Sequence, residues 1–442
     1  MKMSGKTSDS VIALFCGAGG MSLGFSQAGF CPVISADIDR DACSTYEMNI
    51  SKEVLNIDLS KPEDGLNKAL ANHTNAFALI GGPPCQGFSS AGLKNGEDKR
   101  NRLIFNYFSI VERVRPRWFL FENVEGLLTA NGGGSVAELI GEFIRIGYRT
   151  RLEKVNFAAY GLPQARKRVI LVGNRLGLNF ELPSARFSFN AGKHKREGLL
   201  PPAPTLDEAI AGLGTAGGDA DEETSYASAQ PTTDYDAFMR AGNSGGTVTL
   251  HFTSVPPRLV PMLARLRPGE TMKDLPEEYW HESYKKRAFR RVLDGTPTEN
   301  RGGAPAGIKR LVGELNALTI TSAATREFIH PRENRPLTLR EAARLQSFPD
   351  EYDFAGGGMS VARQIGNAFP PMAARVLAEH LATLDGAFGS ARSPSSGTNL
   401  GALIGYHLTD SFGRSPALAN TEALLESLRT EQHSLRFEWL AE

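Results

Sequence analysis

The sequence lacks long apolar runs. None of its 442 residues lie in a run approaching the ~20 apolar residues that a membrane-spanning helix needs. The N-terminal segment MKMSGKTSDS also lacks the apolar centre of a signal peptide. We therefore expect a soluble, cytoplasmic protein that does not associate with a membrane.

Cysteine is scarce as well. The four cysteines are irregularly spaced, and they form no Cys-x-x-Cys pair and have no histidine cluster nearby: Cys16, Cys31, Cys43 and Cys85. This spacing predicts neither a disulfide framework nor a metal site. An isolated cysteine is more often a small buried side chain than a nucleophile, and this is the expectation for the first three.

Net charge is absent, because 49 basic residues balance 49 acidic ones. Composition therefore does not indicate a nucleic-acid partner, and only local clustering of Lys and Arg could do so. One cluster, at residues 279–291, interleaves aromatic residues with Lys285, Lys286, Arg287, Arg290 and Arg291. As a charge run alone, it is equally typical of a solvated helix face.

Short apolar runs alternate with helical patterns over residues 11–175. The runs predict strands at 11–15, 32–36, 77–80, 118–121 and 169–173. Helical spacing predicts helices that end at Gly29 and before Pro116. This alternation predicts an α/β fold with a parallel, doubly wound sheet. Further along, a capping box from Thr338 to Glu341 opens a helix that stops at Pro349, and another helix begins at 370–371.

A glycine loop follows the first strand. Gly17 and Gly19 would let backbone amides approach a ligand, and Asp37 follows about 20 residues later, where a carboxylate can accept from ribose hydroxyls. The pattern suits any adenosyl cofactor. Ser22 replaces the third glycine of a dinucleotide loop, which disfavours a dinucleotide. Ile38 could cover an adenine, and Asp58 could accept from its amino group.

Cys85 lies in the segment GGPPCQGFS, which follows the strand at 77–80. This places the thiol at the carboxyl edge of the sheet, where open α/β folds bind ligands. A free thiol has a pKa near ~8.5, so a nucleophilic Cys85 needs nearby positive charge, for which Arg166 and Arg168 are candidates. Glu122 follows the next strand and can donate a proton to a ring nitrogen.

Five segments in this order resemble the motif series of the bacterial restriction-modification type of cytosine-5 DNA methyltransferases: LFCGAGG, GGPPCQGFS, FENV, QARKR and RQIGNAFPP. The resemblance covers about residues 11–175 and 318–385. It implies a doubly wound, Rossmann-like S-adenosylmethionine methyltransferase domain formed by residues 1–185 and 326–388. It also implies a smaller, loop-rich target recognition domain with a linker at 186–325, and leaves the tail at 389–442 without an assigned role.

The same resemblance implies the chemistry. Cys85 attacks carbon 6 of a flipped-out cytosine, and Glu122 acts at ring nitrogen 3 and the exocyclic amine. Arg168 holds the base carbonyl, and Arg166 supports the loop. Family logic assigns S-adenosylmethionine to Phe15, Gly17, Gly19, Asp37, Ile38, Asp58, Pro83, Leu103, Asn367 and Phe369. One departure is Ala13, where the family commonly has Asp; it can change a hydrogen bond near the cofactor but removes no reacting group.

The long insertion at about 201–318 lies where the family has its target recognition domain. In that position the basic residues at 285–291 become expected phosphate or base contacts, which makes double-stranded DNA the expected partner of a monomeric enzyme. Functional pairing with a restriction endonuclease is a further expectation.

Three alternatives remain open from the sequence. They are a cytosine-5 methyltransferase acting on RNA, a catalytically silent DNA-binding protein, and a nicotinamide-dependent dehydrogenase. The insertion favours DNA, the presence of every reacting group argues against a silent protein, and the glycine loop argues against the dehydrogenase.

Overall fold

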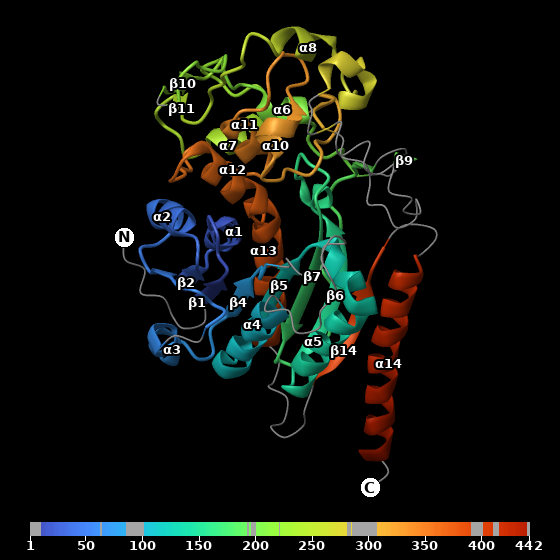
Figure 1. Cartoon of the computed structure of the whole chain (residues 1–442). Coiled ribbons are helices and arrows are strands. Elements are labelled where there is room, and N and C mark those ends of the chain that lie inside the picture. The colour runs from blue at the N-terminus through green and yellow to red at the C-terminus, as the bar shows by residue number, and fades with distance from the viewer. Residues whose placement is uncertain are drawn as a thin grey trace. The chain divides into compact units, whose positions relative to one another are not determined.

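The computed structural model describes residues 10–61, 64–84, 101–191, 194–195, 200–220, 222–280, 284, 307–389, 401–409 and 415–439. The chain forms two compact units (Figure 1). The first, here called the sheet unit, comprises Met1–Tyr160, Lys167–Ala185 and Phe369–Glu442. The second unit comprises Gly161–Arg166 and Arg186–Ala368.

The sheet unit is built on an eight-stranded sheet in the order β14-β6-β7-β5-β4-β1-β2-β3. Its strands are β1 (Ser10–Leu14), β2 (Cys31–Asp37), β3 (Val54–Asn56), β4 (Ala78–Gly81), β5 (Trp118–Asn123), β6 (Arg149–Asn156), β7 (Lys167–Asn174) and β14 (Ala402–His407). The five predicted strands are confirmed as β1, β2, β4, β5 and β7. Every pairing is parallel except those of β7, which runs antiparallel to β5 and β6. The expected parallel direction is therefore wrong for β7, because the connection from β6 is too short to cross back over the sheet.

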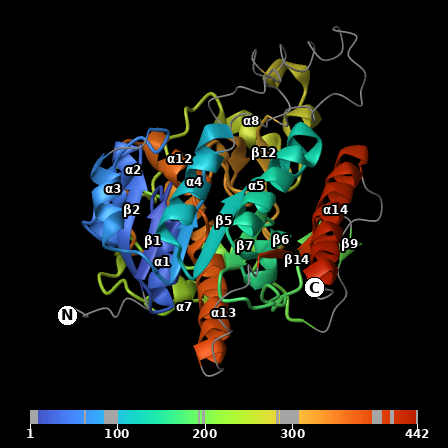
Figure 2. The same cartoon turned by 90° about the horizontal axis from the view of Figure 1, so that it is seen from below.

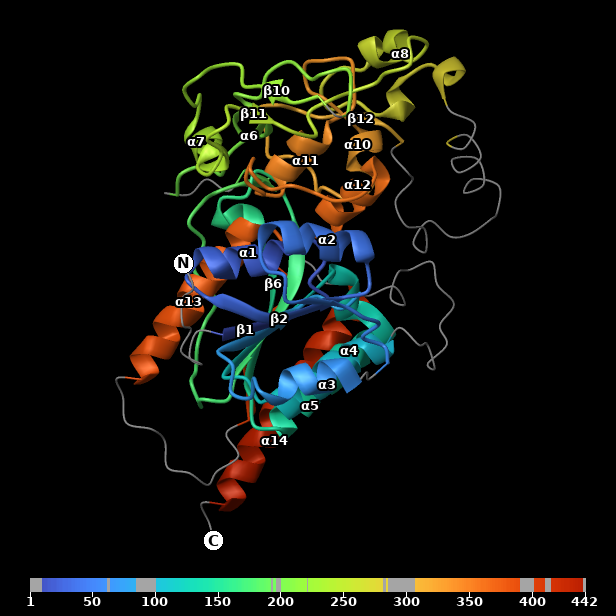
Figure 3. The same cartoon turned by 90° about the vertical axis from the view of Figure 1, so that its left-hand side faces the viewer.

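Helices cover both faces of this sheet, as the predicted doubly wound fold requires (Figure 3). One face carries α1 (Gly20–Gln27), α2 (Arg40–Asn49) and α13 (Pro371–Gly389); the other carries α3 (Asp64–Ala71), α4 (Asn101–Val114) and α5 (Gly134–Arg145). The predicted helix ends near Gly29 and Pro116 are confirmed, and so is the helix start at Pro371. A Cβ on Gly24 would lie 2.3 Å from the Pro371 carbonyl oxygen, so glycine is what lets α1 approach α13.

The core of the sheet unit is apolar and aromatic. Ile12, Leu79 and Phe119 from the strands are fully buried with Tyr107 of α4 and Phe143 of α5. The rings of Phe119 and Phe143 stack at 4.0 Å between centroids. Aromatic burial of this size stabilises the sheet face strongly, since each ring removes a large apolar area from water.

The C-terminal segment completes the same unit. Strand β14 pairs with β6 at the sheet edge, and α14 (Pro416–Trp439) packs beside α5 and the 3₁₀ segment η2 (Glu125–Gly133), as Figures 1 and 2 both show. Thr421 anchors the helix by donating from its hydroxyl to the Leu128 carbonyl oxygen at 2.5 Å.

The described residues of the second unit form mostly short elements. They include the helices α6 (Leu206–Ile210), α7 (Asp234–Arg240), α8 (Val260–Arg265), α10 (Ala324–Glu327), α11 (Leu339–Leu345) and α12 (Gly358–Asn367), with 3₁₀ turns at Met272–Asp274 and Glu277–Tyr279. Among its described residues, two-stranded ladders join β8 (Asn190–Ala191) to β9 (His194–Lys195), β10 (Thr224–Ser225) to β11 (Thr247–Val248), and β12 (Lys309–Arg310) to β13 (Phe328–Ile329). The predicted capping box is confirmed at the start of α11, where Thr338 and Glu341 bond each other's backbone amides.

Buried charge pairs hold this unit together. The Arg344 guanidinium bonds Asp350 at 2.8 Å and Asp236 at 3.0 Å, and all three side chains are fully buried. Arg335 donates to Glu341 at 2.7 Å. Burial alone raises the pKa of Glu341, but the hydrogen bonds from Arg335 outweigh it and lower this pKa to about 2. The unit is therefore stabilised by paired charges.

Neither a membrane-spanning helix nor a metal-binding cluster is found in the part of the chain that the structure covers. No helix there is both long and apolar enough to cross a membrane. No cluster of His, Cys, Asp or Glu among those residues has the form of a metal site.

Candidate functional site

The candidate site lies where the parallel strands of the sheet unit end. The carboxyl ends of β1 to β5 meet at one edge, and the strand order reverses between β1 and β4. Phe15, Asp37 and Asp58 lie at or just after the ends of β1, β2 and β3, and Pro83 and Glu122 lie at those of β4 and β5. Open α/β sheets bind ligands at such a reversal.

The glycine loop is locked to the end of β2. The Gly17 amide donates to Asp37 Oδ2 at 2.8 Å, and the Asp39 amide donates to Asp37 Oδ1 at 2.9 Å. Each carboxylate oxygen has a second lone pair, so Asp37 can still accept from ribose hydroxyls. Burial raises the pKa of Asp37 above its ordinary value.

The loop backbone is unusual. Phe15 has a φ of 52°, Gly17 of 52° and Gly19 of 86°. A bulky residue with positive φ is a strained conformation, and such strain is concentrated at functional sites. The Phe15 ring packs partly against the apolar core, so its neighbours fix this conformation.

The other predicted cofactor residues fall into two groups. In the sheet unit, Ile38 is 66% exposed, Leu103 is half-buried on α4, and Phe369 is buried against Phe157 with 4.8 Å between ring centroids. Asp58 accepts from the Ser60 amide at 2.9 Å, and hydrogen bonds from Ser60 lower the pKa of Asp58. Asn367 is exposed at the end of α12 and belongs to the second unit.

Glu122 and Arg168 form an ion pair at the same edge. Arg168 Nε lies 2.9 Å from Glu122 Oε1, and both side chains are about 15% exposed. The pairing follows from strand direction: the antiparallel β7 begins where β5 ends, and Glu122 is in register with Ile170. If β7 were parallel to β5, Arg168 would lie at the opposite edge of the sheet from Glu122.

The loop after β4 is held against this pair. The Asn123 side chain donates to the Pro83 carbonyl oxygen at 3.0 Å. A Cβ on Gly82 would lie 2.7 Å from Glu122 Oε2, so only glycine lets the carboxylate lie this close to the loop. The segment that leads to Cys85 is thus fixed beside Glu122.

Cys85 itself, together with Lys285, Lys286, Arg287, Arg290 and Arg291, lies outside the described residues. Two of the other cysteines, Cys16 and Cys43, have raised pKa values, as expected of thiols that are not nucleophiles. Burial raises the pKa of Cys16 well above its ordinary value, and burial raises that of Cys43 to about 11. Neither thiol is appreciably ionised near neutral pH.

Arg166 lies in the second unit and is almost fully buried. Its guanidinium donates to the backbone oxygens of Ile320 at 2.8 Å, Ala368 at 3.0 Å and Gly366 at 3.1 Å. Gln164 adds bonds to the Ile320 amide at 2.9 Å and to the Leu345 oxygen at 2.6 Å. Arg166 therefore supports the loops that carry Ile320 and Ala368. Gln164, to which the sequence assigned no role, supports the same part of the second unit.

The described aromatic residues of the basic cluster have a packing role. Tyr284 is buried in a small apolar cluster with Leu275, and its ring meets that of Trp280 edge to face at 5.2 Å. The Trp280 indole donates to the Leu275 carbonyl oxygen at 2.9 Å. The described aromatics of this stretch thus build the second unit.

Comparison with known proteins agrees with this geometry. The family model for C-5 cytosine-specific DNA methylase matches residues 10–383. The type II methyltransferase M.AgeI of Thalassovita gelatinovora is 32% identical over 432 residues, which covers 83% of this chain and 98% of the relative. M.XorII of Xanthomonas oryzae pv. oryzae is 32% identical over 426 residues and covers 90% of each chain. Among solved structures, a prophage-encoded Escherichia coli protein described as a DNA modification methyltransferase superposes with a TM-score of 0.65 at 25% identity, covering 85% of this chain and 99% of that one.

Proposed function

Because this chain belongs to the C-5 cytosine-specific DNA methylase family, it methylates carbon 5 of cytosine in DNA, and we propose that Cys85 is the covalent nucleophile of this reaction. The observation that supports the assignment is the Glu122–Arg168 ion pair beside the loop leading to Cys85. Arg168 Nε and Glu122 Oε1 are 2.9 Å apart. The paired groups and the thiol would then act on one pyrimidine ring.

The proposed reaction begins with Cys85 and Glu122 acting together on the ring. The Cys85 thiolate forms a bond to carbon 6 of cytosine, and Glu122 gives a proton to ring nitrogen 3 as the ring accepts the electron pair. Carbon 5 becomes nucleophilic and gains the methyl group. Loss of the carbon 5 proton to a base and return of the nitrogen 3 proton to Glu122 then restore the ring double bonds and expel the thiolate.

Arg168 orients the base. One N–H group of its guanidinium faces Glu122 and another donates to the Lys167 carbonyl oxygen at 2.8 Å. A guanidinium has five N–H groups in a planar fork, so Arg168 can also donate to the cytosine carbonyl. The ion pair thus holds the acid and the carbonyl ligand next to each other.

The methyl donor fits the sheet edge. S-adenosylmethionine, when bound, supplies a methyl group on a sulfonium sulfur that leaves as a thioether. Asp37 accepts from the ribose, Ile38 covers the adenine, and Asp58 accepts from its amino group. The strained loop at Phe15, Gly17 and Gly19 holds the amino-acid part, and Pro83, Leu103 and Phe369 complete the pocket. Asn367 stays a predicted donor contact that the family resemblance implies. The exposed Ile38 and the remaining lone pairs of Asp37 support this fit.

The remaining functional assignments concern DNA. A base within a duplex cannot present carbon 6 to a thiol, so the cytosine is flipped out at a cost of a few kcal/mol. We assign target recognition to residues 186–325, with Lys285, Lys286, Arg287, Arg290 and Arg291 as DNA contacts. We also propose that the enzyme acts on a specific double-stranded sequence as a cytoplasmic monomer. Relatives that are type II methyltransferases support its proposed pairing with a restriction endonuclease.

Trapping of the covalent intermediate tests the nucleophile. A duplex in which 5-fluorocytosine replaces cytosine, incubated with S-adenosylmethionine, should leave an adduct that survives denaturation and maps to Cys85, because fluorine cannot leave as the proton does. The C85S variant should form no adduct and show no turnover while still binding the donor. Conditions that support wild-type turnover but give no adduct at Cys85 would refute the assignment. An RNA duplex of the same sequence serves as the control for substrate class.

A further inference from the structure

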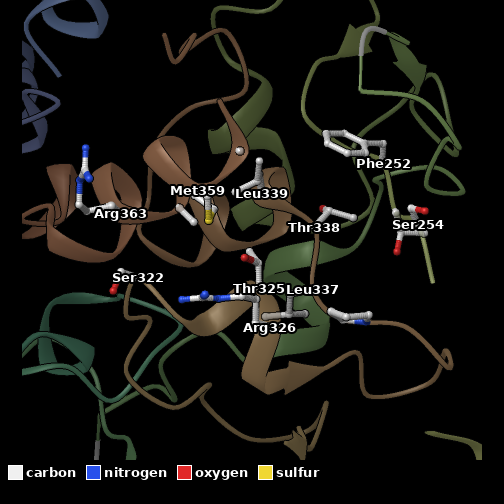
Figure 4. A pocket seen from close by; sticks show the side chains of 14 residues that line it. Phe252, Ser254, Ser322, Thr325, Arg326, Leu337, Thr338, Leu339, Met359 and Arg363 are labelled. Carbon is white, nitrogen blue, oxygen red and sulfur yellow. The ribbon is translucent and has the colours of Figure 1, made fainter. Parts of the chain in front are cut away.

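The second unit contains a pocket of about 440 Å³ (Figure 4). It lies between α10 with its preceding turn, the start of α11, and α12. The described residues that line it include two arginines, Arg326 and Arg363, several hydroxyl side chains and a set of apolar ones, but no carboxylate. A volume of this size is typical of sites for small organic ligands or parts of larger ones.

Arg326 offers a positive charge to this pocket. Its side chain is exposed and extends toward Ser322, with Thr325 beside it (Figure 4). In the same unit, Arg344 and Arg335 are paired with buried carboxylates, whereas no acceptor for Arg326 is found among the described residues. A guanidinium with neighbouring hydroxyls is suited to a phosphate, whose oxygens accept from both.

The wall across from Arg326 is apolar (Figure 4). Leu339 is buried there, and Met359 is 81% exposed at the beginning of α12, whereas the buried Leu337 lies beside Arg326. An exposed methionine provides a soft, adaptable contact surface for flat or irregular groups. The pocket therefore matches a ligand that combines an anionic group with a ring, as one nucleotide of a nucleic acid does.

The motif that supplies Arg168 also builds these walls. Arg166 bonds the Ile320 oxygen, just before Ser322, and the Gly366 oxygen at the end of α12. A Cβ on Gly366 would lie 2.2 Å from the Ser322 amide nitrogen, so glycine permits this close approach of the two walls. The pocket is thus a positioned feature of the fold, fixed by side chains of the Q-A-R-K-R segment.

We propose that this pocket binds one nucleotide of the DNA substrate, with a backbone phosphate at Arg326 and Ser322 and the sugar or base against Leu339 and Met359. The proposal rests on the proposed function, because it takes the methylated duplex as the ligand. It adds a DNA contact in the part of the second unit that the basic cluster at 285–291 does not include.

The salt dependence of DNA binding tests the charge. Affinity for a duplex that the wild-type protein methylates is measured over a range of KCl concentrations. R326Q should bind about tenfold more weakly at low salt, and the log–log slope should fall by about one unit, because one phosphate contact is lost. R326K should keep most of the slope. R332Q is the matched control, since Arg332 is exposed in the same unit but already paired with Asp207, and its slope should not change.

Two further experiments test the apolar wall and identify the DNA phosphate that Arg326 contacts. M359E places an acid on the apolar wall and should weaken binding to the same duplex, whereas inorganic pyrophosphate should compete poorly because it lacks the ring. On a series of duplexes with single neutral methylphosphonate linkages, one linkage should abolish the difference between R326Q and wild type. Equal slopes for wild type and R326Q, with the Cys85 adduct still formed, would overturn the pocket and leave the nucleophile intact; a missing adduct in wild type would overturn the proposed function instead.

Discussion

The sheet unit and the second unit bury different kinds of side chain. In the sheet unit, Phe119, Phe143 and Tyr148 are fully buried and stack or meet edge to face. In the second unit, Arg344 and Asp350 are among many buried polar and charged groups. A sheet needs only apolar faces, since its backbone groups pair with each other. Loops have no such ladder, so buried guanidinium and carboxylate groups must satisfy their carbonyls and amides.

This difference suits the division of labour proposed for the two units. The sheet edge carries reacting groups, which must be held in one geometry by rigid elements. The second unit must present irregular loops to DNA. Arg310 shows how such loops are fixed: its guanidinium donates to the backbone oxygens of Leu263, Leu266 and His330, all at 2.7 or 2.8 Å.

Breaking a buried pair should be the strongest test of the contrast. The R344M variant leaves Asp350 and Asp236 buried without their shared cation. We expect a loss of about 3–5 kcal/mol in the free energy of unfolding, measured by urea denaturation. The R344M/D350N double variant should lose less than R344M, because one uncompensated charge is removed. If R344M unfolds at the wild-type urea concentration, the charge network does not stabilise the second unit.

Acid should weaken the second unit through Glu341. The pKa of Glu341 is about 2 in the folded protein, below its unfolded value of about 4.3. A depressed pKa means that the stabilisation is complete above the unfolded value and is lost as pH falls from about 4.3 toward 2. This difference between the folded and unfolded pKa of Glu341 contributes roughly 3 kcal/mol to the free energy of unfolding at neutral pH. Thermal unfolding of wild type and E341Q between pH 6 and 3 measures it: the difference between the two should shrink as pH falls, and a constant difference would contradict the assignment.

The two units also differ in how far their sequences predict them. The strands at β1, β4 and β5 are short apolar runs, which predict their own burial. The runs RTRLEKVN of β6 and ALIGYH of β14 are mixed in polarity or isolated, so neither was expected as a strand. Single candidate residues such as Glu122 and Asp37 followed from their places after strands.

Pairings were harder to predict than residues. The Glu122–Arg168 contact depends on β7 being antiparallel, which no local pattern reveals. In the second unit the Tyr226 hydroxyl bonds Asp350, more than 100 positions away in the chain. Partners at such separations are brought together by tertiary packing, and local propensity carries no information about them. Thr338 and Glu341 were predictable as a pair because a capping box spans only three residues.

Thr338 therefore provides the smallest and cleanest test, because a local signal and a tertiary contact meet in one side chain. Its hydroxyl accepts the Glu341 amide at 3.1 Å and lies 3.0 Å from Nδ1 of the buried His251. T338A should lower the free energy of unfolding by about 1 kcal/mol if the cap alone matters. T338S keeps the oxygen and should remain within about 0.5 kcal/mol of wild type. A loss in T338A near 3 kcal/mol would show that the His251 contact, which leaves a buried ring nitrogen unsatisfied when removed, contributes more than the cap. The tertiary network would then outweigh local capping even at the position that the sequence predicted best.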